Sequence, residues 1–128
     1  KKLGFEDVVE VSLGADITTL REANEFLERV PEEIPYMGTS CCNSWTIMVE
    51  KMFPDQYEYI SDSASPMVET AKYIKNKDPE AKITFIGPCI SKKLEALRKD
   101  VKDYEIGKSV VYGHVCCERH RTVRNRSI

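Results

Sequence analysis

The stretch over residues 82–95, KITFIGPCISKKLE, carries the clearest structural signal in the sequence. Its first six residues are rich in β-branched and apolar side chains, which is typical of a strand, and Gly87 and Pro88 then interrupt the pattern. Residues 91–97 begin a helix immediately afterwards. Cys89 therefore lies between the end of a strand and the start of a helix, which is where open α/β sheets bind their ligands.

The same arrangement occurs upstream of this stretch. Residues 34–38 are predicted to form a short buried strand that leads into the pair Cys41 and Cys42. Asn43 or Ser44 can then cap a helix that Pro54 closes. The cysteine pair, like Cys89, thus follows the carboxyl end of a predicted strand.

The remaining segments alternate in the same way. Residues 7–12 are predicted to form a strand, Gly14 a turn, and residues 17–30 an amphipathic helix capped by Asp16 or Thr18. Ser65 and Pro66 suit the cap and first position of another helix. Alternating strands and helices predict an α/β fold, a mostly parallel sheet with flanking helices. Its ligand-binding edge would collect all three cysteines.

Composition and charge restrict the class of protein. The 128 residues suit one domain or one lobe, and 41% hydrophobic with 31% charged residues is a globular balance. A net charge of -2 gives no basic stripe for nucleic acid, and no apolar stretch reaches the roughly 18 residues of a membrane span. We expect a cytoplasmic protein, in which five reduced cysteines indicate metal binding or redox chemistry.

The cysteine spacing favours an iron-sulfur cluster over a local zinc site. Thiolates suit both, but ligands from separate strand ends suit a cluster held between lobes better than a clip with two-residue spacing. Adjacent cysteines cannot easily both bind one cluster, so one of Cys41 and Cys42 is free for another task, such as proton transfer. Taken singly, each cysteine could instead be a small buried hydrophobe.

Two cysteine-containing motifs resemble those of iron-only (FeFe) hydrogenases and follow the same order along the chain. Residues 39–45, TSCCNSW, resemble the first cluster motif, usually TSCCPxW, and residues 87–95, GPCISKKLE, resemble the second, usually MPCxxKKxE. Between them Ser61 and the Ser65-Pro66 step match a family serine and Ser-Pro, and residues 14–18, GADIT, resemble an upstream segment. The likeness runs over about residues 4–98.

The resemblance implies one lobe of the two-lobed H-cluster domain. It implies that Cys42 and Cys89 bind the 4Fe-4S part of the H-cluster and that Cys41 passes protons to its di-iron part. Lys92 would hydrogen-bond a cyanide ligand of the di-iron part, because a cation stabilises an anionic ligand in a dry pocket.

Further positions match supporting residues of the family. Pro88 would line the cavity, and Glu95 would form a salt bridge. Glu22, Glu25 and Ser61 would relay protons, although without the resemblance the two glutamates would be read as a solvated helix face.

The activity implied is the reversible reduction of protons to dihydrogen, with electrons from ferredoxin or ferredoxin-like domains. The remaining part of the hydrogenase domain would complete the cofactor, so the chain alone is expected to be inactive. Asn43 replaces the usual proline and Gly87 the usual methionine, which would open space near the di-iron part and suit a sensory variant. The alternatives are a non-catalytic hydrogenase-like protein of iron-sulfur cluster assembly and a structural, partner-binding α/β domain.

The domain organisation changes near residue 112. Residues 1–112 are predicted to be a partial H-cluster domain, and residues 113–128 an atypical basic tail that is either truncated or altered, or naturally disordered. The family's third motif, with the last two cysteine ligands, is absent, and Cys116-Cys117 does not resemble it. A zinc site that combines this pair with His114 or His120 is an irregularly spaced alternative.

Overall fold

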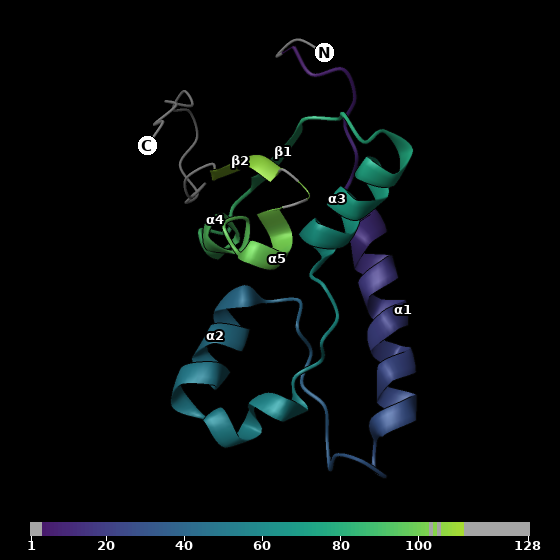
Figure 1. Cartoon of the computed structure of the whole chain (residues 1–128), viewed down its shortest axis with the longest axis vertical. Coiled ribbons are helices and arrows are strands. Elements are labelled where there is room, and N and C mark those ends of the chain that lie inside the picture. Colours follow the sequence, from purple (N-terminus) through teal and green to yellow (C-terminus); the bar gives the residue numbers. More distant parts are fainter. Residues whose placement is uncertain (1–3, 103, 105, 112–128) are drawn as a thin grey trace, which may run out of the picture.

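The computed structural model describes residues 4–102, 104 and 106–111 (Figure 1). The elements in chain order are α1 (Ser12–Arg29), α2 (Asn43–Met52), the 3-10 helix η1 (Pro54–Tyr59), α3 (Pro66–Lys77), β1 (Ile83–Gly87), α4 (Ser91–Glu95), α5 (Lys99–Lys102) and β2 (Ile106–Val111). In Figure 1, α1 runs beside α3, while α2 and η1 form a separate arm below α4 and α5.

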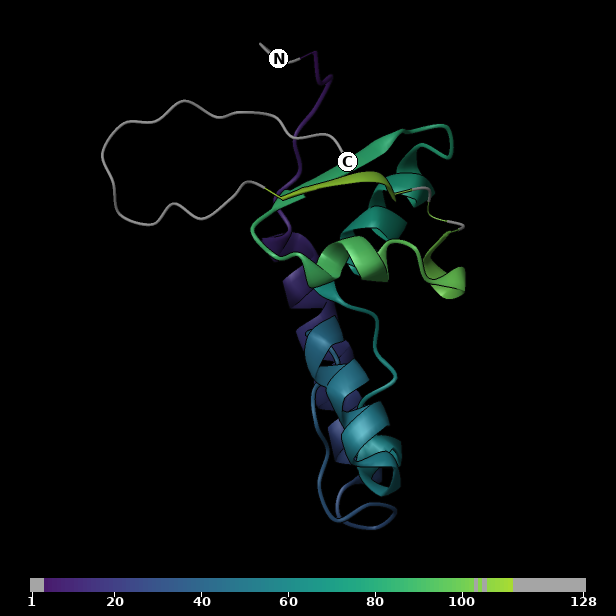
Figure 2. The same cartoon turned by 90° about the vertical axis from the view of Figure 1, so that its left-hand side faces the viewer.

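The sheet in the described residues is smaller than predicted. It consists of β1 and β2, which pair in parallel from Ile83 with Ile106 to Gly87 with Val111. Figure 2 shows these strands lying together at one end of the molecule, beyond α3 and α4. The strand predicted over residues 82–87 is therefore confirmed, whereas the larger parallel sheet is not.

Two predicted strands do not form. Residues 7–10 have no regular structure, and residues 34–38 contribute only a bridge between Gly38 and Ile60. A strand needs a neighbour for its backbone groups, and no described strand pairs with residues 7–10. Residues 34–38 also contain Pro35, which has no N–H to donate to a ladder.

Gly14 lies inside a helix rather than in the predicted turn. Helix α1 begins at Ser12, before the predicted caps, and Gly14 is buried where α1 meets α3. A Cβ at this position would come within 2.1 Å of the Pro66 carbonyl oxygen and 2.3 Å of the Thr70 hydroxyl. The close approach of the two helices therefore requires glycine, and Thr18 Oγ1 adds a 3.0 Å hydrogen bond to the Ala64 carbonyl.

Helix α1 presents its polar side to the rest of the chain. The apolar stripe that predicted the helix is largely exposed, with Leu20 at 68% and Leu27 at 76%. The side with Glu22 and Glu25 is half-buried instead. The helix is confirmed, but in the described residues its apolar stripe does not face the core.

The core gathers around α3. Its buried residues are Met67, Val68, Ala71, Val101 and Ile106. Ile83 and Phe85 of β1 pack against this cluster, which ties the small sheet and α5 to α3. The predicted helix starts at Pro66 and Ser91 are confirmed, as is the helix after the first cysteine pair. Every helix in the described part of the chain is too short or too polar to cross a bilayer.

Candidate functional site

The two cysteine-bearing turns lie against each other. Lys92 Nζ donates a hydrogen bond of 3.1 Å to the Cys41 carbonyl. Beside it, Asn43 Nδ2 donates to Ser91 Oγ at 3.0 Å and to the Ser91 carbonyl at 3.3 Å, across 48 residues of sequence. The expected convergence of the two motifs is therefore present.

The cysteines of these turns are free and exposed. Cys42 is the N-cap residue of α2, and Cys89 lies between β1 and α4. Cys41, Cys42 and Cys89 all have free, accessible thiols, which does not suit the alternative of small buried hydrophobes. Within the described residues no group of three or more histidine, cysteine or acidic side chains is arranged to hold a metal ion.

Backbone contacts hold the first cysteine turn in place. The Gly38 amide donates to the Tyr59 carbonyl and the Ser61 amide to the Gly38 carbonyl, both at 2.8 Å. Two residues further on, Ser40 Oγ donates to the Ser63 carbonyl at 2.5 Å. The segment before Cys41 is thereby fixed against residues 59–63.

Glu22 reaches the same turn from α1. Its Oε1 accepts a hydrogen bond from the Ser40 amide at 2.7 Å and lies 3.2 Å from Ser40 Oγ, whose single hydrogen points to the Ser63 carbonyl. The Glu22 side chain thus ends one residue before Cys41. This glutamate is bonded to another segment and is not part of a freely solvated helix face.

Glu25 and Ser61 form a second polar group on the same side of α1. Ser61 Oγ donates to Glu25 Oε2 at 2.5 Å, and Arg29 Nη1 donates to Glu25 Oε1 at 2.6 Å. Burial raises the pKa of Glu25, but the hydrogen bonds from Ser61 and Arg29 outweigh it and leave the pKa below its ordinary value. Glu25 is therefore held as a carboxylate.

The two polar groups meet at one residue. The Ser63 carbonyl accepts from Ser40 Oγ, while the Ser63 amide donates to Ser61 Oγ at 3.1 Å. Glu22 and Ser40 are in this way joined to Ser61 and Glu25 through a single peptide segment. All three residues predicted as a proton relay are brought to one side of α1.

Lys92 and Glu95 form a buried ion pair. Their charged atoms lie 2.5 Å apart, and the side chains are 13% and 4% exposed. The predicted salt bridge of Glu95 is therefore present, and its partner is Lys92. Pro88 is exposed beside Cys89.

The space expected at Gly87 is already filled. Gly87 is buried, and a Cβ built on it would lie 2.6 Å from Cζ of Phe85. Residues two apart in a strand share a face, so the Phe85 ring covers the place of a side chain at position 87. The expectation that glycine opens space here was wrong.

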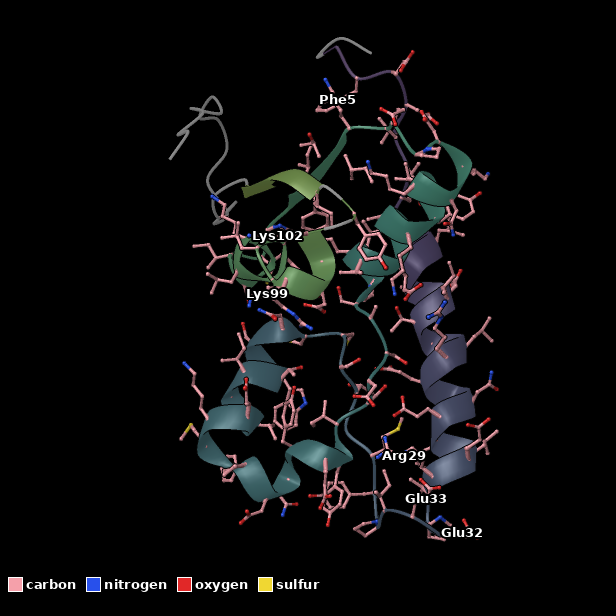
Figure 3. The ribbon with its side chains drawn as sticks, in the orientation of Figure 1. Phe5, Arg29, Glu32, Glu33, Lys99 and Lys102 are labelled. Carbon is pink, nitrogen blue, oxygen red and sulfur yellow. The ribbon has the colours of Figure 1, made fainter. Side chains whose placement is uncertain are left out.

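Three residues make contacts in the site that were not predicted from the sequence. Arg29 binds Glu25, and Figure 3 labels it at the C-terminal end of α1. Its spacing of four residues from Glu25 is a signal for a helical ion pair. Asn43 and Ser91 join the cysteine turns, and no sequence spacing indicates a contact between residues 48 positions apart.

Two hollows are present in the described part of the chain, and one of them adjoins these groups. A polar cavity of about 300 Å³ is lined by Ser40, Ser61 and Glu95 among others, so it adjoins the relay residues. A larger one of about 790 Å³ lies between residues 5–11, α3 and β1 and contains no predicted site residue. We take the smaller cavity as part of the site because it adjoins the first cysteine turn.

Comparison with known proteins places the chain among hydrogenases and their relatives. Residues 1–112 match the family described as iron only hydrogenase large subunit, C-terminal domain. The chain is 32% identical over 111 residues to iron hydrogenase 1 of Clostridium pasteurianum, covering 80% of this chain and 19% of that protein. It is 33% identical over 113 residues to the cytosolic Fe-S cluster assembly factor NAR1 of Candida dubliniensis, covering 82% and 19%.

Solved structures similar to this chain are also FeFe-hydrogenases. A FeFe-hydrogenase structure that reveals stepwise H-cluster assembly has a TM-score of 0.76 at 32% identity, over 86% of this chain and 31% of that one. An apo variant of the HydA1 FeFe-hydrogenase of Chlamydomonas reinhardtii has a TM-score of 0.71 at 30% identity, over 86% and 32%. The chain thus spans about a fifth of these two curated relatives and about a third of the solved chains.

The predictions for Cys116, Cys117, His114 and His120 lie outside the described residues.

Proposed function

The chain belongs to the iron-only hydrogenase large-subunit family, and on that premise we propose that it is the first lobe of a site that reversibly reduces protons to dihydrogen. In this proposal Cys42 and Cys89 supply two of the four thiolates of a 4Fe-4S cluster. The observation that carries it is the contact between the two cysteine turns through Lys92 with Cys41 and Asn43 with Ser91.

The thiols present suit half of a cluster site. Clusters of this kind are held by four thiolates. Cys42 and Cys89 are exposed on adjacent turns, and Cys41 has a separate role in the proposal. The remaining two ligands would come from outside this chain, in agreement with its coverage of about a third of the solved relatives.

Lys92 would hold an anionic ligand of the di-iron part. When bound, that part supplies the site at which dihydrogen forms or splits. The Lys92 ammonium is largely buried and is fixed by Glu95 and the Cys41 carbonyl, so little side-chain entropy remains to be lost on binding. Pro88 would form part of the wall beside it.

Cys41 and the polar side of α1 would move protons. The Cys41 thiol would exchange a proton with the reacting centre, and the hydroxyl of the neighbouring Ser40 lies 3.2 Å from Glu22 Oε1. The Ser63 backbone holds Ser40 and Ser61 in place but does not carry protons itself. A proton would instead cross between these serines through water in the polar cavity that both of them line, and would reach Glu25 from Ser61. Groups that exchange protons at hydrogen-bond distances are what such a relay requires.

A second candidate function is non-catalytic work in iron-sulfur cluster assembly. The 33% identity to the Candida assembly factor supports it. Such relatives are expected to lose Cys41 and Lys92, whereas this chain has both and brings them into contact. We therefore favour the hydrogenase, in the cytoplasm and with ferredoxin-like electron donors. A sensory variant stays within the proposal only through Asn43, because the space expected at Gly87 is filled by the Phe85 ring.

A chimera separates the two functions. Residues 1–112 of this chain would replace the matching segment of the Clostridium iron hydrogenase, and the product would be matured anaerobically and assayed for dihydrogen with a reduced dye. We expect a 4Fe-4S signal and measurable turnover. Cys41→Ser should keep the signal and lose turnover, whereas Cys42→Ser or Cys89→Ser should lose the signal.

The outcomes are distinct. A chimera that binds the cluster and di-iron part but evolves no dihydrogen would favour the assembly function. A folded chimera that binds no cluster would support the alternative of a structural, partner-binding domain, provided that the parent enzyme binds its cluster in a parallel preparation. Equal signals in the Cys42→Ser and unmodified chimeras would remove Cys42 from the ligand set.

A further inference from the structure

Asn43 makes the buried link between the two cysteine turns. It is 3% exposed, directly follows Cys42, and is the first residue of α2. Its partner Ser91 is 9% exposed, lies two residues after Cys89, and is the first residue of α4. Each end of this hydrogen bond is therefore next to, or one residue removed from, a proposed cluster ligand.

The orientation of the Asn43 amide is fixed by chemistry. Its nitrogen lies 3.3 Å from the Ser91 carbonyl, which can only accept a hydrogen bond. The Ser91 hydroxyl could bond either amide atom, but a flipped amide would set Oδ1 against the Ser91 carbonyl, so the orientation with nitrogen toward Ser91 is the one that bonds both of its oxygens. Oδ1 is then buried and has no partner in the described part of the chain. An unpartnered buried oxygen costs about 1–3 kcal/mol, so this amide is not a choice that optimises stability alone.

The other link between the turns is of a different kind. Lys92 reaches the Cys41 carbonyl with a long, flexible side chain that it shares with Glu95. Asn43 has a short side chain with two rotatable bonds and donates twice to one residue. A short buried link loses less entropy and restricts movement more than a long side chain does.

We propose that Asn43 is a positioning residue that sets the separation of the Cys42 and Cys89 thiols. This inference rests on the proposed function only for its purpose, the binding of one cluster by both thiols. The link itself can be measured without metal.

The measurement compares the effective concentration of the two thiols in matched variants. All would carry Cys41→Ser, Cys116→Ser and Cys117→Ser, so that only Cys42 and Cys89 react. A short bifunctional maleimide either bridges the two thiols or is capped by a second reagent. The ratio of bridged to capped product reports how often the thiols meet.

Asn43→Pro is the main variant because it should still fold. Proline is favoured at the first position of a helix, and Cys42 before it already has an extended backbone with φ -108° and ψ 102°. Proline removes both donated hydrogen bonds. Asn43→Ala is the second variant, and Ser44→Ala, an exposed serine one residue along α2, is the control.

We expect the bridged-to-capped ratio to fall about fivefold in Asn43→Pro and Asn43→Ala, as for the loss of one or two ordinary hydrogen bonds. Ser44→Ala should leave it unchanged, and circular dichroism should show unchanged helix content in all variants. An unchanged ratio in folded Asn43→Pro would overturn the inference. Failure of the chimera to bind a cluster would refute the proposed function and leave this result standing, so the two failures are distinguishable.

Discussion

Replacing Ser61 by alanine tests the polar group on α1. Ser61 is 4% exposed, donates to the Glu25 carboxylate at 2.5 Å and accepts from the Ser63 amide at 3.1 Å. A hydrogen bond to a charged group contributes about 1.5–3 kcal/mol. Because Arg29 still binds Glu25, we expect Ser61→Ala to lower the free energy of unfolding by about 2 kcal/mol at neutral pH.

The stability lost in Ser61→Ala should depend on pH. The folded-state pKa of Glu25 is lowered, so the stabilisation from its charged form is complete above the ordinary glutamate pKa of about 4.3. It disappears as the pH falls through the lowered pKa of the folded state. The difference between the unmodified chain and Ser61→Ala should therefore shrink in acid.

Urea unfolding followed by circular dichroism measures this difference at neutral and acid pH. Ser44→Ala, which removes an exposed hydroxyl, is the control and should change stability by less than about 0.5 kcal/mol. The reasoning would be refuted by a Ser61→Ala variant as stable as the control. A loss of equal size at both pH values would show that the Glu25 charge is not involved.

Three further predictions, which use four substitutions, test other parts of the structure. Gly14→Ala should lower the melting temperature sharply, since its Cβ would overlap the backbone of α3 at 2.1 Å, and scanning calorimetry would detect an unchanged midpoint if this packing is wrong. Lys92→Ala should cost about 3–5 kcal/mol in urea unfolding because it leaves the Glu95 carboxylate buried without its partner; a cost below about 1 kcal/mol would mean that Glu95 is solvated. Gly87→Met should destabilise through its clash with the Phe85 ring, and Phe85→Ala should relieve that clash, so thermal melts that show strictly additive effects would contradict the contact.

Local signals in the sequence were sufficient for most helices and for the strand before Cys89. Pro66 at the start of α3 and the apolar run of β1 express preferences of the residues themselves, and both elements form as predicted. The placement of Cys89 after a strand and Cys42 before a helix followed from the same signals. The rule that ligands gather beyond strand ends applies only to Cys89, because the strand predicted before Cys42 does not form.

Contacts between elements that are distant in sequence were not predictable from local signals. The apolar stripe on α1 predicts a helix correctly, but its periodicity cannot tell which neighbour will cover it, and in the described residues Leu20 and Leu27 stay exposed. Residues 7–10 have strand composition without a strand to pair with. Strand formation depends on such pairing more than helix formation does, which explains why the sheet was overestimated.

Position 87 shows the limit of reasoning one residue at a time. Glycine in place of a larger residue suggested open space, but the Phe85 ring two residues earlier occupies it. The contact between Asn43 and Ser91 likewise depends on the approach of two helices whose first residues are far apart in sequence. Packing of this kind is decided by the whole fold.

Reconstitution would show whether thiols from the two distant turns bind one cluster. The chain would be incubated anaerobically with iron, sulfide and a small thiol that supplies the two remaining ligands. Elemental analysis would give the iron bound per chain, and Mössbauer spectroscopy would identify the cluster type. A variant that retains only Cys42 and Cys89 should bind one 4Fe-4S cluster per chain and lose it when either becomes serine. Equal iron-sulfur binding by a variant that retains only Cys41, Cys116 and Cys117 would contradict this binding mode.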